Sequence, residues 1–193
     1  DSTTLTTSMD VLEPLRAAPA RHLTDLMEGA AVTGARAVTL REHEFAVQIG
    51  LRAVPGEQGA AALESVLGVP LPTAHGEVTG DLDVLRLAPD EFLAVDVSRR
   101  QEPGVEAPYQ EALEEGVPGQ AVDLSANRTV LVLEGPGARG VLEKSVALDL
   151  HPREFGVGRA EATLLSTIPV VLVRSGEETW RILPRASFAD HMV

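Results

Sequence analysis

The feature of this sequence that most constrains its fold is an order of elements that occurs twice. An apolar strand-like run, a Pro-Gly pair, a helical run and a proline recur at an offset of about 80 residues. The matching residues are Pro55-Gly56 with Pro136-Gly137, Leu63-Glu64 with Leu142-Glu143, and Val66 and Pro72 with Val146 and Pro152. Because self-similarity at a fixed offset indicates a repeated supersecondary unit, the sequence predicts two related halves, about 30–97 and 121–193.

Hydrophobic periodicity predicts which elements each half contains. Strand patterns cover 37–40, 45–54, 83–87, 91–97, 129–133, 162–165, 170–174 and 179–183. Helical patterns cover 21–29, 58–67, 109–115, 138–148 and 187–192, the last with Ser187 as its N-cap. Residues 98–120 carry many acids, prolines and glycines, which indicates a surface connector around one short helix.

These elements form hairpins far more often than β-α-β units, so the predicted class is α+β. We expect mainly antiparallel sheets with helices covering one face. The polar residues 1–10 are predicted to be a disordered tail, followed by a single domain over 11–193.

Composition excludes several classes of function. Cysteine is absent, which removes disulfides, thiolate metal sites and thiol nucleophiles. The net charge of −13 would repel phosphate backbones and anionic lipid, so we expect no nucleic-acid and no membrane partner. No apolar run approaches the roughly 20 residues that a membrane span needs. The polar amino terminus does not resemble a secretory signal, so the predicted location is cytoplasmic.

Gly135, Gly137 and Gly140 match the Gly-x-Gly-x-x-Gly pattern of dinucleotide-binding sites. Such a site also needs an acidic residue about 20 positions later, at the end of the next strand. Residues 159–163 instead begin a strand, and Glu134 would set a carboxylate beside the pyrophosphate. The motif therefore predicts a tight strand-to-helix turn, and nucleotide binding is the least favoured alternative.

The remaining polar residues do not form a known catalytic or metal-binding pattern. The histidines (His22, His43, His75, His151 and His191) lack metal-ligand spacing, and Ser125 and Ser187 lack the Gly-x-Ser-x-Gly context of a nucleophile. We expect Asp123 to brace the segment after it and His151 to make a structural hydrogen bond. No catalytic, cofactor-binding or metal-ligating residue is predicted on this chain.

Several stretches together resemble a known family. They are VDLSANR at 122–128, GPGAR at 135–139, DLHPR at 149–153 and PRASFA at 184–189. With them the chain resembles the gamma subunit of heterotetrameric sarcosine oxidases, a family similar to the folate-binding domain of aminomethyltransferases. That resemblance implies an aminomethyltransferase-like fold. It departs at Thr167-Ile168-Pro169-Val170, where the transferases carry aspartates that face the folate amine.

The resemblance implies a noncatalytic scaffold subunit of a complex that oxidatively demethylates sarcosine to glycine. The complex would release hydrogen peroxide and pass the one-carbon unit to tetrahydrofolate. FAD, FMN, NAD and tetrahydrofolate would bind to the other subunits, and the partners would be the alpha, beta and delta subunits. Candidates for the contact surface, or for the core behind it, are Arg153, Phe155, Trp180 and Phe188.

Two alternatives remain open at this point. One is a small independent folate-dependent one-carbon transferase, which would need an acid near Ile168, from Asp149 or Glu161. The other is a folate-binding module without catalysis.

Overall fold

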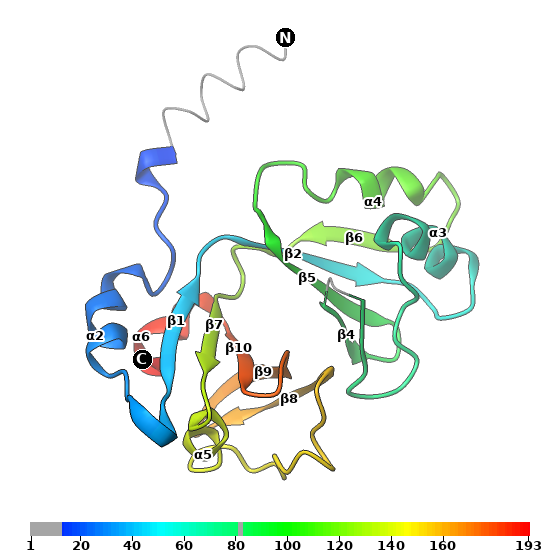
Figure 1. The fold of residues 1–193 in the computed structure, drawn as a ribbon. Helices are drawn as coiled ribbons and strands as arrows, with labels where there is room; N and C mark the ends of the chain where they lie inside the picture. The colour runs from blue at the N-terminus through cyan, green and yellow to red at the C-terminus, as the bar shows by residue number, and fades with distance from the viewer. Residues whose placement is uncertain (1–12, 81–82) are drawn as a thin grey trace.

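Two antiparallel sheets of five strands each form the centre of the computed structural model, which describes residues 13–80 and 83–193 (Figure 1). The first sheet runs β3 (Val78–Thr79), β4 (Asp83–Ala88), β5 (Glu91–Arg100), β2 (Ala46–Arg52) and β6 (Gln120–Asp123). The second runs β1 (Thr39–His43), β7 (Val130–Glu134), β10 (Thr179–Pro184), β9 (Ile168–Arg174) and β8 (Arg159–Leu165). The predicted antiparallel character is confirmed; the predicted tail 1–10 lies outside the described residues.

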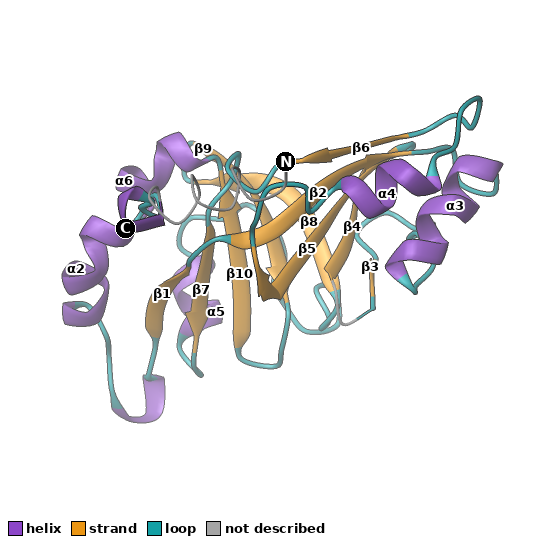
Figure 2. Cartoon of the chain, turned by 90° about the horizontal axis from the view of Figure 1, so that it is seen from above, coloured by secondary structure: helices purple, strands orange, loops and turns teal. Residues whose placement is uncertain are grey.

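Helices cover the outer face of each sheet, as Figure 2 shows. On the first sheet lie α3 (Gln58–Leu67) and α4 (Ala107–Ala112). On the second lie α2 (Thr24–Gly29), α5 (Ala138–Leu142) and α6 (Ala189–Met192). Short 3-10 turns precede or join them: η1 (Glu13–Leu15), η2 (Arg21–Leu23), η3 (Gly34–Arg36) and η4 (Ala186–Phe188). The predicted α+β class is confirmed.

The chain forms four layers, in the order helices, sheet, sheet, helices, because the apolar side chains of a strand alternate between the two faces of its sheet. In β7, Leu131 and Leu133 pack toward the helices, whereas Val130 and Val132 pack between the two sheets. Successive strand side chains point to opposite faces, so an unbroken apolar strand can be buried on both. Each fully buried leucine or valine contributes about 1.5–3 kcal/mol.

The two sheets have the same internal order once their strands are matched by position. The order β6-β2-β5-β4-β3 corresponds to β1-β7-β10-β9-β8. However, β1 precedes β2 in the chain yet pairs with β7, and β6 precedes β7 yet pairs with β2. Each half therefore gives its first strand to the sheet of the other half. This correspondence supports the internal duplication that the sequence predicts.

Three local predictions are wrong. The helix predicted over 138–148 ends at Leu142, because the chain leaves it to form a bridge between Val146 and Leu165. Ser187 lies inside η4 and is not an N-cap; the residue before α6 is Phe188, which makes no side-chain capping bond. The predicted connector runs directly into strand β6, which the period-2 pattern was too short to reveal.

Among the described residues, no helix is both long enough and apolar enough to cross a membrane.

Candidate functional site

The glycine motif forms the turn between β7 and α5, as predicted. Gly135 has a φ of +121°, and a Cβ there would overlap the carbonyl oxygen of Ala37. At Gly137 a Cβ would lie 2.6 Å from the carbonyl oxygen of Arg36. The close backbone approach that a dinucleotide site reserves for pyrophosphate is thus taken by the chain's own residues 36–37. At Gly140, in contrast, a Cβ would meet nothing within 4 Å.

A groove of about 440 Å³ opens beside this turn, between η3 and α5. We call it the glycine-turn groove; it is lined by Val32, Arg36, Val38, Pro136, Gly137, Arg139, Gly140, Val141, Glu143 and Lys144. Val32 and Val141 are 48% and 41% exposed. The groove has three cationic side chains and one acid, Glu143, which pairs with Arg139 at 3.2 Å. It is therefore a basic, apolar surface on a chain of net charge −13.

A smaller pocket of about 210 Å³ adjoins the groove and shares Pro136 and Arg139 with it. Arg174 is buried in its floor, 4% exposed, and its guanidinium lies 5.6 Å from the Trp180 ring centre. One terminal nitrogen donates to the carbonyl of Phe155 at 2.9 Å, and the other to the carbonyl of Glu177 at 2.9 Å. These bonds fix the floor of the pocket.

The structure separates the four predicted contact residues. Phe155 and Trp180 are buried, with ring centres 5.3 Å apart, so they belong to the core behind the surface. Arg153 is exposed and follows Pro152, which lines the small pocket. Phe188 is half-buried in η4 and lines neither the groove nor the pocket.

Sequence inspection missed the residues that make the groove, chiefly Val32, Arg36, Val141 and Lys144. Their side chains meet only because the turn at 135–137 packs on residues 36–37, about 100 positions earlier. Neither segment carries a periodic signal for that contact.

Two predicted structural roles are confirmed. The Asp123 carboxylate accepts hydrogen bonds from the backbone N–H of Ser125, at 2.8 Å, and from its hydroxyl. His151 Nδ1 accepts a hydrogen bond from the backbone N–H of Arg153 at 3.2 Å. Both polar groups stabilise turns.

Asp149 and Glu161, the two acids that an independent transferase would need near Ile168, do not line the surface beside that residue. A shallow depression beside Ile168 is lined by Arg128, Ala147, Ala162, Thr163, Leu164, Pro169, Val170 and Val171. Asp149 accepts the backbone N–H of His151 at 2.9 Å, and Glu161 pairs with Arg159 and His75 at 2.6 Å each. Within residues 13–80 and 83–193, no cluster of three or more histidine, aspartate or glutamate side chains could hold a metal ion.

Comparison with known proteins decides the family. The model described as "Sarcosine oxidase, gamma subunit family" matches residues 51–193. This chain belongs to the sarcosine oxidase gamma subunit family. It is 57% identical, over 182 residues, to the sarcosine oxidase subunit gamma of Corynebacterium sp. strain U-96, covering 93% of this chain and 87% of that one. The resemblance predicted from the sequence is confirmed.

Solved structures agree with this assignment. A chain of the heterotetrameric sarcosine oxidase from Corynebacterium sp. U-96, in complex with pyrrole 2-carboxylate, superposes with a TM-score of 0.86 at 57% identity. The match covers 92% of this chain and 90% of that chain. Aminomethyltransferase T of the Bartonella henselae glycine cleavage system has a TM-score of 0.62 at 18% identity, covering 92% of this chain and 56% of that one. That second match shows the shared fold alone.

Proposed function

We propose that this chain is a noncatalytic scaffold subunit of a heterotetrameric sarcosine oxidase. The observation that carries the proposal is the similarity to a chain of the Corynebacterium heterotetramer, with 57% identity and a TM-score of 0.86 over nearly the whole chain. The polar groups of the described residues support it, because Asp123, Asp149 and Glu161 are all engaged in structural contacts. Each of these three acids therefore has a structural contact that accounts for its position.

The reaction of the complex is part of the same proposal. Sarcosine would be oxidised to glycine with release of hydrogen peroxide, and its one-carbon unit would pass to tetrahydrofolate. The alpha, beta and delta subunits would be the partners of this chain, and they would hold FAD, FMN, NAD and tetrahydrofolate. The family membership of the chain supports these assignments.

The glycine-turn groove is the contact surface that we assign to the largest of those subunits. Interfaces favour arginine and exposed apolar side chains over isolated acids, and the groove combines both features. Its local positive charge on an acidic chain fits an acidic partner surface, because like charges across an interface would oppose docking. Arg153 follows Pro152, which lines the adjoining pocket, and extends the basic surface. Phe188 would contact a partner subunit at a separate place.

Gly140 offers a matched pair of variants for testing this assignment. Gly140→Trp would fill the groove, whereas Gly140→Ala adds one methyl group where nothing lies within 4 Å. Each variant is co-expressed with the other three subunits and recovered through an affinity tag on the large one. We expect Gly140→Ala to be recovered like the wild type and Gly140→Trp to be recovered at least about tenfold less, which corresponds to about 1.4 kcal/mol.

The outcomes separate the two claims. If the wild-type chain is never recovered with the large subunit and stays monomeric, the scaffold function is wrong. If Gly140→Trp assembles as well as Gly140→Ala, the chain is a subunit but docks through another surface.

A further inference from the structure

The first sheet does not cover all of the inner face of the second sheet. On β8 and β9 the side chains of Ala160 and Val171 are buried in the apolar layer between the sheets. Because every second residue of a strand points to the same face, Ala162, Leu164 and Pro169 lie on that face as well. These three side chains are exposed, Leu164 by 51%, and they line the shallow depression of about 510 Å³ at this end of the sheet. We call them the hairpin face.

The same strand presents unpaired backbone groups. β8 is the last strand of its sheet, and the N–H of Ala160 points away from β9, to the carbonyl of Gly76 at 2.9 Å. Since the groups of an antiparallel strand alternate in direction, the N–H and C=O of Ala162 and the N–H of Leu164 also point away from β9. The pairing of Leu164 with Pro169 agrees, because Pro169 has no N–H to donate across the ladder. Within residues 13–80 and 83–193 these three groups have no hydrogen-bond partner.

Other segments of the chain limit the length of this open edge. The bridge between Glu77 and Arg159 covers one end, and the bridge between Val146 and Leu165 covers the other. The open stretch between them is 162–164, about 10 Å long at roughly 3.3 Å per residue. Covered ends prevent a long strand of another chain from adding to the sheet, whereas a short extended segment that leaves the sheet at both ends fits.

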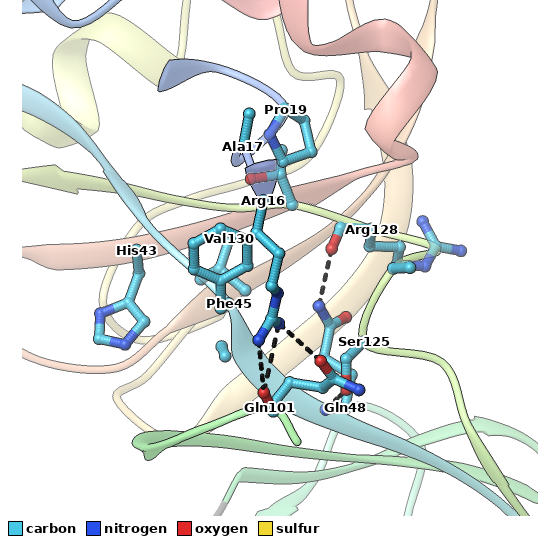
Figure 3. A pocket seen from close by; sticks show the side chains of 13 residues that line it. Arg16, Ala17, Pro19, His43, Phe45, Gln48, Gln101, Ser125, Arg128 and Val130 are labelled. Atoms are coloured by element: carbon cyan, nitrogen blue, oxygen red, sulfur yellow. Dashed lines mark hydrogen bonds between the residues drawn. The ribbon is translucent and has the colours of Figure 1, made fainter. Parts of the chain in front are cut away.

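Two arginines border the hairpin face. Arg128 lines the depression, and in Figure 3, which shows a neighbouring pocket of about 320 Å³, its guanidinium points away from the other labelled side chains. One terminal nitrogen donates to the carbonyl of Leu183 at 3.0 Å, which fixes the side chain. Arg185 forms a bridge with Arg128, and burial together with the charge of Arg185 lowers the pKa of Arg128. Glu91, the acid that acts on Arg128, is itself paired with Arg52 at 3.0 Å. Both arginines stay protonated, so the surface attracts a carboxylate.

We propose that the hairpin face docks a short, extended, acidic segment of a partner subunit. The backbone of that segment pairs with Ala162 and Leu164. An apolar side chain of the segment packs on Leu164 and Pro169, and a carboxylate lies against Arg128 and Arg185. This is the strand-addition mode of recognition, in which backbone hydrogen bonds give affinity and side-chain contacts give specificity. The depression shares no lining residue with the glycine-turn groove, so this is a second contact surface.

A second copy of this chain is a poorer occupant than an acidic partner. In a symmetric pair each copy presents the same patch to the other, so the arginines of both copies would face each other. The inference rests on the proposed scaffold function, because the partner is a subunit of the same complex.

Charge changes test the side-chain contacts. Leu164→Glu and Arg185→Glu each place an acid beside the hairpin face, whereas Arg99→Glu reverses the charge of another exposed arginine. Each variant is assembled with the other subunits, and the complex is diluted until half of it has lost this chain. We expect that concentration to rise at least about tenfold for Leu164→Glu and Arg185→Glu, because an acid there repels the partner, and to stay at the wild-type value for Arg99→Glu. If all three variants assemble as tightly as the wild type, the hairpin face is not a docking surface.

Hydrogen exchange tests the backbone pairing and needs no variant. We expect the amide hydrogens of Ala162 and Leu164 to exchange in the free chain and to be retained in the assembled complex. The amide hydrogen of Ala160 is the internal control, because its bond to Gly76 should retain it in both states.

The outcomes separate this inference from the scaffold function. If the wild-type chain never joins the other subunits, the scaffold function itself is wrong. If the chain assembles normally and Ala162 and Leu164 still exchange in the complex, only the assigned docking surface is wrong. A free chain that is dimeric and retains both hydrogens would assign the face to a second copy and overturn the acidic partner.

Discussion

Alanine substitutions at the first two glycines of the motif should destabilise the chain, whereas alanine at the third should not. At Gly135 a Cβ would overlap the carbonyl oxygen of Ala37, and at Gly137 it would lie 2.6 Å from that of Arg36. Both obstacles are backbone atoms that no side-chain rotation can move. Gly140 lies in helix α5 with open space around it, so its alanine variant is a control within the same motif.

The size of each effect follows from these contacts. Gly135→Ala places alanine at a φ of +121°, and we expect about 1–3 kcal/mol for that strain and about 1–3 kcal/mol for the overlap. Gly137→Ala has the overlap alone, about 1–3 kcal/mol. Gly140→Ala should instead stabilise the helix by up to about 1 kcal/mol, because alanine loses less backbone entropy than glycine.

Thermal unfolding of the purified chain measures all three variants. For a chain of this size, about 1 kcal/mol shifts Tm by roughly 2–4 °C, so the two costs of Gly135→Ala together should lower Tm by about 4–24 °C. Gly140→Ala should leave it unchanged or raise it by a few degrees. If Gly135→Ala were neutral, the motif would not be a turn packed on residues 36–37, and the argument against a nucleotide site would lose its basis.

Three further perturbations follow from the packing. Trp180→Ala should cost about 3–5 kcal/mol in urea unfolding of the free chain, since the ring packs on Phe155; an unchanged free energy would place Trp180 outside the core. Asp83→Asn should cost about 3 kcal/mol, because it leaves the Arg181 guanidinium unpaired between the sheets; no loss of stability would mean that the pair contributes nothing. Burial lowers the pKa of His43 from its usual 6.5, so the unfolded chain binds its proton more readily. Stability should therefore fall as pH drops below about 6.5, and His43→Gln should flatten that dependence in melts at several pH values.

Local signals in the sequence were enough to predict most elements. Helix α3 occupies the predicted 58–67, since an Ala- and Leu-rich run is followed by Gly68 and by two prolines that end it. Strands β2 and β5 follow from alternation over seven or more residues. Strand β6 has only four residues, and its partner β2 lies about 70 positions earlier. Such a strand is stabilised by tertiary pairing that local periodicity does not contain.

The candidate sites were less accessible than the fold for the same reason. The glycine-turn groove needs η3 beside α5, and the contact of Gln48 with residues 125–128 needs the start of β2 beside the link from β6 to β7. Gln48 looks like an ordinary polar residue of a strand, yet it is 1% exposed, and its amide bonds the backbone carbonyl of Arg128, which is 80 positions later. A buried polar group of this kind is found only by pairing each donor with an acceptor in three dimensions.

The strand exchange also determines where the chain passes from one sheet to the other. If each half kept its own first strand, β1 would pair with β2 and a hairpin would close there; instead β1 pairs with β7, and β6 pairs with β2. The segment from β1 to β2 and the segment from β6 to β7 then both connect the two sheets. The polar backbone groups of these two segments need hydrogen-bond partners. Gln48 and Ser125 meet this need, since Gln48 Nε2 donates to the carbonyl of Arg128 and the backbone N–H of Gln48 donates to Ser125 Oγ at 2.9 Å. The contact between the two segments thus joins residues of both halves, and neither half alone contains it.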